Sequence, residues 1–324
     1  MIKEIEKMLP IKFKNCEIIK IENGASRRKY YRLKKNEQNA ILMDSSKEPK
    51  QFKNYLKVHK ILSKTKISIP EIYEIDRNKK NILLEDFGEL RFDQILNKFE
   101  LKDLLSIAVE SLIEIKKEIG FDHNYLLPIY NYNIFKSEIS EFVNFFYPYH
   151  EKKKMPIELQ EEFYDTWKSQ FDLFDFSFTS FVHKDYNFNN LIYLPNKNKH
   201  YKCGIIDFQN SFWGEDCWDL FSLLEDSRIL IDDQYNEFFI DYFCLKTNQG
   251  NVKKVFANKY HFFNSSRQTR ILGRWVKLSN MFNQKWYLDF IEITNKRLVR
   301  SLQKPYMKKI RSLYYKLIPQ LYAF

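Results

Sequence analysis

The stretch His183-Lys184-Asp185-Tyr186-Asn187-Phe188-Asn189-Asn190 decides the fold of this 324-residue chain. It has the pattern H-x-D-x-x-x-x-N, and an apolar run, Gly204-Ile205-Ile206, leads into Asp207 further along. Transfer of a phosphoryl group needs a carboxylate that accepts a proton from the attacking hydroxyl, and hard oxygen ligands for magnesium. The pattern supplies both. Any one of these residues could instead satisfy loop amides, so only their joint spacing carries the hypothesis.

The sequence after this stretch predicts a small β-hairpin. Two apolar segments, Leu191–Leu194 and Tyr201–Asp207, flank the turn-rich run Pro-Asn-Lys-Asn-Lys. Such a run between two short apolar segments is typical of a hairpin connection. Asp207 is therefore expected at the end of the second strand, and helices are expected again from Trp218.

The N-terminal part alternates short apolar segments with turn residues, which predicts strands. The five expected strands are Cys16–Ile21, Lys29–Lys34, Ala40–Asp44, Glu71–Asp76 and Asn81–Glu85. Pro49 precedes apolar residues at helical spacing up to Leu62, which predicts one helix between the third and fourth strands. Long amphipathic segments follow, at 101–119, 134–146 and 159–171.

These elements predict an α+β chain with two lobes. We expect residues 1–85 to form a nucleotide-binding lobe with a five-stranded antiparallel sheet and one helix. Residues 86–324 are expected to form a mainly helical catalytic and substrate-binding lobe that contains the hairpin. The order of strands first and helices afterwards predicts this class.

Composition narrows the function classes. The chain is 44% hydrophobic and 17% aromatic, which excludes a disordered protein. Its net charge of +11 comes from scattered lysines, and without a recognition motif it predicts a solvated basic surface and no nucleic-acid partner. The four cysteines lack metal-ligand spacing, and no apolar run is long enough for a membrane span. These features predict a cytoplasmic protein with no membrane partner.

The catalytic stretch resembles the aminoglycoside phosphotransferase and choline kinase group of the protein-kinase-like superfamily. The matching residues are His183, Asp185, Asn190, Leu191, Ile206, Asp207, Phe208, Gln209, Asp219 and Leu220. The resemblance implies a bilobal kinase fold, with ATP and Mg²⁺ as cofactors. It implies that Asp185 is the catalytic base and that Asn190 and Asp207 hold magnesium. His183 and Asp219 are implied to support the loop structurally.

A narrower resemblance covers about residues 22–278. Its segments are Gly24–Ser26, Arg28–Leu33, Ile41–Asp44, Leu83–Gly88, Asp207–Asn210, Asp219–Leu224 and Arg267–Leu278. They are similar to the N-acetylmuramate/N-acetylglucosamine anomeric kinases of peptidoglycan recycling. This implies ATP-dependent phosphorylation of the anomeric hydroxyl of an amino sugar.

The sequence departs from protein kinases at the third strand. Met43 stands where a kinase places the lysine that holds nucleotide phosphates. Phosphate charge in a cleft still needs a cation, so we expect Arg28 or Arg32 to replace that lysine, although both could be ordinary exposed strand residues. Gly24, Ala25 and Ser26 are expected to approach the phosphates, and Glu85, Asp86 and Phe87 to bind adenine through their backbone.

The acceptor is expected near Asp185, with Arg267 or Arg270 binding a carboxylate if the sugar carries one. The exposed face of a helix would account for both arginines equally well. Choline, homoserine or an aminoglycoside remains an alternative acceptor. A regulatory pseudokinase remains an alternative from another class, because the lysine is missing and the glycine loop is poor. The oligomeric state stays open.

Overall fold

The computed structural model describes residues 13–22, 27–35 and 38–322. Gly24, Ala25 and Ser26, expected to contact phosphate, lie outside the described residues. The chain divides into two compact units. The first joins Met1–Ile119 to Phe188–Ser211, and the second joins Gly120–Asn187 to Phe212–Phe324.

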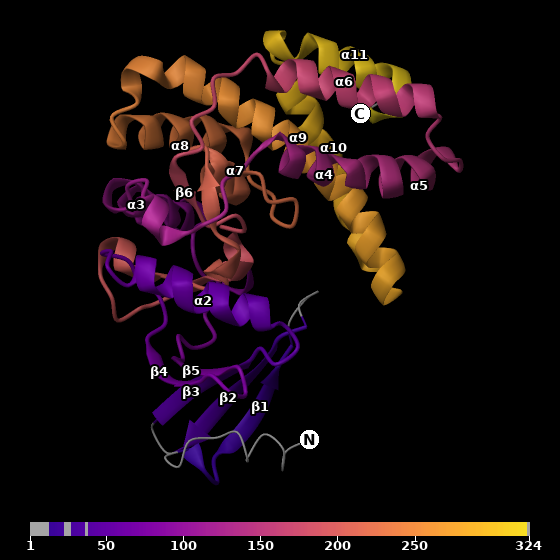
Figure 1. The fold of residues 1–324 in the computed structure, drawn as a ribbon. Coiled ribbons are helices and arrows are strands. Elements are labelled where there is room, and N and C mark those ends of the chain that lie inside the picture. Colours follow the sequence, from indigo (N-terminus) through magenta and orange to yellow (C-terminus); the bar gives the residue numbers. More distant parts are fainter. Residues whose placement is uncertain (1–12, 23–26, 36–37, 323–324) are drawn as a thin grey trace. The chain divides into compact units, whose positions relative to one another are not determined.

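The first unit contains the predicted five-stranded antiparallel sheet, drawn in indigo and purple in Figure 1. Its strands are β1 Glu17–Ile21, β2 Lys29–Lys35, β3 Gln38–Asp44, β4 Ile72–Asp76 and β5 Asn81–Glu85, in the order β1-β2-β3-β5-β4. Tyr31, Leu42 and Leu83 lie opposite one another in the register and are buried together. Buried and less buried residues alternate along β2, and this alternation sets the register. The predicted fold class is confirmed.

A single helix, α2 (Pro49–Leu62), follows the third strand, as predicted. Pro49 occupies its first turn, where a missing amide hydrogen costs nothing. One face of α2 contacts the segment just after Asp207. Tyr55 stacks on Phe208 with ring centroids 4.7 Å apart, and the Gln51 amide donates to Asn210 Oδ1 over 3.0 Å. The helix therefore holds the segment that carries Asp207.

The predicted hairpin is present, with strands β7 (Leu191–Tyr193) and β8 (Cys203–Ile205), and it belongs to the first unit. Gly204 bridges to Ser68, and Ile192 bridges to Arg91. Helix α3 (Leu101–Glu118) belongs to the same unit. The compact units thus do not divide at residue 85, because the hairpin packs on residues of the N-terminal part. The functional division into residues 1–85 and 86–324 stays a prediction.

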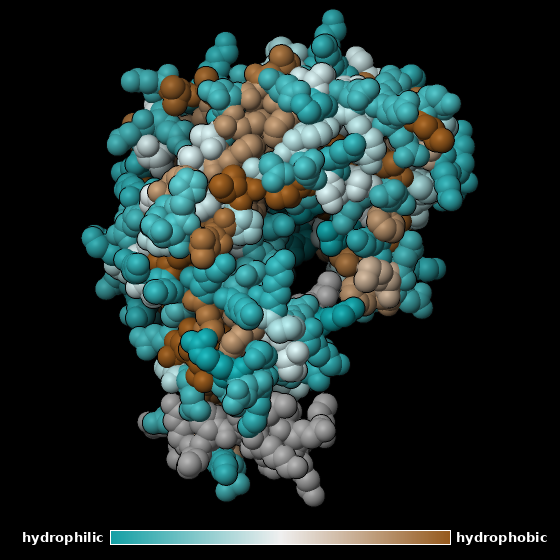
Figure 2. Space-filling model, in the orientation of Figure 1, coloured by the Kyte–Doolittle hydropathy of each residue, from teal (hydrophilic) through white to brown (hydrophobic). Residues whose placement is uncertain are grey.

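The second unit is mainly helical. Its helices are α4 Tyr132–Glu141, a π-helix Phe142–Phe146, α5 Tyr147–Glu151, α6 Ile157–Phe171, α7 Trp218–Leu224, α8 Asp233–Lys246, α9 Lys253–Phe282, α10 Ile291–Leu302 and α11 Lys308–Leu317. One antiparallel strand pair, β6 (Ser180–Val182) and β9 (Phe212–Gly214), lies among them. Within the described ranges, no helix is long and apolar enough to cross a bilayer. The face in Figure 2 is mostly hydrophilic, as the charged composition predicts.

Helix α4 and the π-helix pack closely against α9. A Cβ placed on Gly273 would lie 2.1 Å from the carbonyl oxygen of Glu141, so only glycine allows this approach. Two ion pairs flank the contact, from Arg270 to Glu138 over 2.9 Å and from Arg274 to Glu141 over 2.7 Å. The segment 134–146 was predicted as one amphipathic stretch, and its last turn widens into a π-helix at this contact. The close packing sets the position of Arg270.

The contact at Gly273 gives a stability prediction. Gly273→Ala should destabilise the protein by about 1–3 kcal/mol or more, because the backbone of Glu141 cannot move away as a flexible side chain would. Chemical denaturation followed by circular dichroism measures this loss. Gly120→Ala is the control, since a Cβ at Gly120 meets nothing within 4 Å. Equal unfolding free energies for the two variants would contradict the prediction.

Candidate active site

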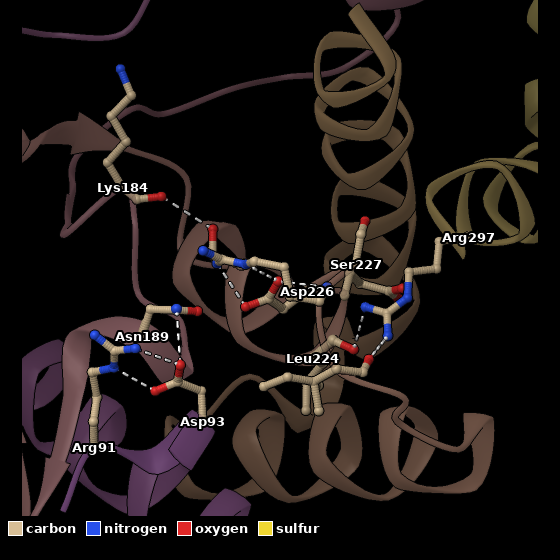
Figure 3. Close-up of polar contacts among 12 residues, drawn as sticks. Arg91, Asp93, Lys184, Asn189, Leu224, Asp226, Ser227 and Arg297 are labelled. Atoms are coloured by element: carbon tan, nitrogen blue, oxygen red, sulfur yellow. Dashed lines mark hydrogen bonds and ion pairs between the residues drawn. The ribbon is translucent and has the colours of Figure 1, made fainter. Parts of the chain in front are cut away.

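Asp219 holds the backbone of the predicted catalytic loop. It lies in the first turn of α7 and is fully buried. Its carboxylate accepts hydrogen bonds from the amides of His183 over 2.8 Å and Lys184 over 3.0 Å. The Ser222 hydroxyl on the same helix donates to the Lys184 carbonyl over 3.3 Å (Figure 3). These bonds support the left-handed backbone of Lys184, φ +84°, and fix the residue before Asp185.

The side chain of Lys184 points into an ionic group centred on Glu138, which the sequence did not reveal. Arg270 Nη1 lies 2.9 Å and Lys184 Nζ 3.7 Å from Glu138 Oε1, and the Tyr130 hydroxyl donates to Oε2 over 2.8 Å. The carboxylates of Glu138 and Asp185 also act on Arg270. Burial alone would lower the pKa of Arg270, but these carboxylates outweigh burial and raise it. No motif links these distant segments, so only their packing brings them together.

Arg267 lies on α9 near Asp185 and is buried, with 7% of its surface exposed. The alternative that an exposed helix face accounts for this arginine is therefore wrong. Burial lowers the pKa of Arg267 to about 10, and the neighbouring cation of Arg270 adds to the lowering. The carboxylates of Asp226 and Asp185 oppose it. The second unit thus places Asp185 and both predicted substrate arginines in one electrostatic neighbourhood.

Asp207 and Arg28 form an ion pair in the first unit. Asp207 follows β8 by two residues and has a left-handed backbone, φ +63°. Its Oδ1 lies 3.0 Å from Arg28 Nη2 and accepts a hydrogen bond from the side-chain amide of Gln209 over 2.9 Å. Arg28 Nε lies 3.3 Å from Glu48 Oε2 near the start of α2. Burial alone would lower the pKa of Arg28, but Tyr30 and Asp207 outweigh it and raise the pKa. Arg28 is thus a buried cation held at Asp207.

Asn190 is joined to the Asp207 segment through the backbone, since its carbonyl accepts from the Ile206 amide over 3.1 Å. Its neighbour Asn189 donates to Asp93 Oδ2 over 3.1 Å, and Arg91 pairs with the same carboxylate (Figure 3). Within the part of the chain that the structure describes, no three His, Cys, Asp or Glu side chains form a metal cluster. Magnesium bound with phosphates needs only one or two protein carboxylates, and the oxygens of Asp207 and Asn190 fit it chemically.

Arg32 has a different role from Arg28. It pairs with Asp86 through Nε at 2.6 Å and Nη2 at 3.0 Å, and it donates to the Gly88 carbonyl over 2.8 Å. The Asp86 side chain is only 4% exposed. Arg32 therefore anchors the segment expected to bind adenine, Glu85–Phe87. Met43 is fully buried and lies opposite Tyr30 and Ile82 in the sheet.

The family match lies on this part of the chain. Residues 144–253, which include the catalytic stretch and the hairpin, match the phosphotransferase enzyme family. This segment is thus similar to a phosphotransferase-family domain. The predicted family resemblance is confirmed over these residues.

Two proteins that carry the same name are similar in sequence to this chain. The chain is 26% identical over 218 residues to an N-acetylmuramate/N-acetylglucosamine kinase of Pseudomonas aeruginosa, covering 66% of this chain and 61% of that protein. It is 23% identical over 307 residues to a kinase of the same name from Neisseria meningitidis serogroup B, covering 91% and 86%. The first match thus spans less than two thirds of that relative's length.

A solved structure shares the fold of most of this chain. An aminoglycoside phosphotransferase with bound ADP aligns over 92% of this chain and 98% of its own, with a TM-score of 0.61. Its sequence identity to this chain is 18%, so the likeness concerns the fold alone. The kinase-like fold predicted from the catalytic stretch is confirmed.

The two arginines of the first unit give a paired prediction. Arg28→Met should raise the KM for ATP and lower kcat at least about tenfold, because it removes a charge-assisted contact to phosphate. Arg28→Lys should recover part of the activity. Arg32→Met should instead lower the unfolding free energy by about 3 kcal/mol or more, since it leaves the buried Asp86 without its cation.

Steady-state kinetics and denaturation measure the two effects separately. Arg77→Met, a change of an exposed arginine in the same unit, is the control for both. Unchanged ATP kinetics in Arg28→Met would remove Arg28 from the phosphate site, and unchanged stability in Arg32→Met would remove the anchoring role of Arg32.

Proposed function

We propose that the protein is an ATP-dependent kinase that phosphorylates the anomeric hydroxyl of N-acetylmuramate or N-acetylglucosamine. The observation that carries this proposal is the loop held by Asp219, because Asp185 on this loop interacts electrostatically with the buried Arg267 and the half-buried Arg270. The name that the two relatives share supports the choice of sugar. Such a reaction would belong to the recycling of cell-wall sugars in the cytoplasm.

Asp185 is proposed to orient the acceptor and take its proton. The anomeric oxygen forms a bond to the γ-phosphorus, and the bond from that phosphorus to the bridging oxygen breaks. ADP leaves with the electron pair of that bond, and the proton of the hydroxyl passes to the carboxylate of Asp185. Asp219 contributes by keeping the backbone of His183 and Lys184 still, so that the carboxylate does not have to be ordered during the reaction.

The first unit is proposed to bind the nucleotide. When bound, magnesium would neutralise the phosphate charge, and Asp207 and Asn190 would hold it. Arg28 would transfer one of its contacts from Asp207 to phosphate, because Asp207 would then face the metal. The backbone of Glu85–Phe87 would bind adenine, and Gly24–Ser26 would approach the phosphates.

The charge near Asp185 disfavours some of the alternative acceptors. Choline and aminoglycosides are cations, and the buried guanidinium of Arg267 would repel them. Homoserine carries both a positive and a negative charge, so the charge of Arg267 does not exclude it. A sugar with a neutral or acidic substituent is compatible with Arg267 and Arg270.

The proposal predicts a specific pattern of turnover. Purified protein with ATP and magnesium should phosphorylate N-acetylmuramate or N-acetylglucosamine, and leave choline and kanamycin unchanged. Phosphorus NMR should show the product phosphate coupled to the anomeric proton. A phosphate on any other hydroxyl, or turnover of choline or kanamycin alone, would contradict the proposed acceptor.

The role of Asp185 predicts a loss of chemistry without a loss of fold. Asp185→Asn should lower kcat about 10²- to 10⁴-fold, as expected for removal of a general base. Its thermal unfolding midpoint should stay within a few degrees of the wild type. Asp165→Asn, at an exposed carboxylate of the same unit, is the matched control and should keep full activity. Near wild-type turnover in Asp185→Asn would refute the role.

A further inference from the structure

Arg267 is a buried cation without a matching hydrogen-bond acceptor. With 7% exposure, its Nε and Nη1 donate to no acceptor among the residues that the structure describes. A buried guanidinium that keeps its charge normally forms several hydrogen bonds, because unpaired burial costs several kcal/mol. Stability alone does not account for an arginine at this position.

The carboxylates of Asp226 and Glu138 form ion pairs with cations other than Arg267. Arg228 binds Asp226 with two bonds, from Nε to Oδ1 and from Nη2 to Oδ2, both 2.8 Å (Figure 3). Glu138 pairs with Arg270, one turn along the same helix. The amide of Gln268, the next residue on α9, donates to the Glu225 carbonyl and to Asn264. Among the described residues, Nε and Nη1 of Arg267 thus have no hydrogen-bond acceptor, whereas Arg270 on the same helix is paired with Glu138.

The electrostatics agree with this geometry. Burial and the nearby cations of Arg270 and Arg228 lower the pKa of Arg267 to about 10. Asp226 and Asp185 act in the opposite direction but do not restore the ordinary value. An anion that arrives beside Arg267 would relieve both the missing hydrogen bonds and the uncompensated charge. The site is therefore suited to an anionic group of a ligand.

We propose that Arg267 is a carboxylate receptor that makes the enzyme selective for an acidic amino sugar. This rests on the proposed function. In that function Asp185 contacts the attacking hydroxyl, and Arg267 lies in its electrostatic neighbourhood. N-acetylmuramate carries a lactyl carboxylate on the same ring as its anomeric hydroxyl. N-acetylglucosamine carries a hydroxyl group in place of the lactyl group. The two sugars therefore differ in the group that Arg267 would bind.

The transferring phosphoryl group is the other anion that could reach a cation in a kinase. The chain offers Arg28 for that group, held at Asp207 in the first unit. Arg267 belongs to the second unit, with Asp185 and Glu138. An effect of Arg267 on phosphoryl transfer itself would appear with every acceptor, whereas an effect on a carboxylate appears only with the acidic sugar.

The test compares two acceptors in three variants. We expect the wild type to prefer N-acetylmuramate, and Arg267→Met to lower kcat/KM for this sugar about 10- to 100-fold, mainly through KM. The same variant should keep kcat/KM for N-acetylglucosamine within about threefold. Arg267→Lys should recover part of the preference, since it restores a cation without the planar donors. Arg274→Met, two turns along α9 and paired with Glu141, should change neither sugar.

A binding measurement completes the test without turnover. N-acetylmuramate should raise the melting temperature of the wild type and fail to do so for Arg267→Met, whose own stability should equal or exceed that of the wild type because an unpaired buried charge is gone. Equal losses on both sugars, a wild type without preference, or loss of the fold in both Arg267 variants would overturn the proposal. A wild type that phosphorylates neither sugar would instead refute the proposed function.

Discussion

The hydrogen bonds of the buried Asp219 carboxylate to the amides of His183 and Lys184 are the constraint on which the rest of the site depends. A carboxylate with no exposed surface is tolerated only when its oxygens are satisfied, so α7 and the catalytic loop form a single rigid piece. Strand β6 leads into the loop, and its partner β9 leads into α7. Because of it, Asp185 has a defined position without any contact to a ligand.

Arg28 and Arg32 are four residues apart, and this spacing gives them different partners. Residues at this spacing lie on the same face but about 13 Å apart along a strand. Arg28 therefore reaches Asp207 and Glu48, and Arg32 reaches Asp86 and the Gly88 carbonyl. Arg28 is proposed to bind phosphate, and Arg32 ties the sheet to the segment that follows β5. In the proposed function, Arg28, which directly precedes β2, would replace the missing strand lysine.

In the second unit, the close contact between α4 and α9 fixes the arginines beside Asp185. Gly273 lets the helices approach until Arg270 reaches Glu138, and the same helix carries Arg267 one turn earlier. Arg270 is paired with Glu138, whereas Nε and Nη1 of Arg267 have no acceptor in the part of the chain that the structure describes. A natural protein that keeps such an unsatisfied charge gives up stability, which is common where a binding site needs it. The packing of one glycine thus supports the proposed specificity.

The sequence alone determined the elements, because strands, helices and turns follow from local periodicity and from proline and glycine positions. All five strands, helix α2 and the hairpin around Asp207 were predictable in this way, as was the spacing from Asp185 to Asn190. Which arginine pairs with which carboxylate follows from the tertiary structure. The same is true of the burial of Arg267 with no acceptor for its Nε and Nη1 among the described residues, and of the three partners of Glu138. These facts depend on contacts between residues far apart in the chain, and no local pattern records them.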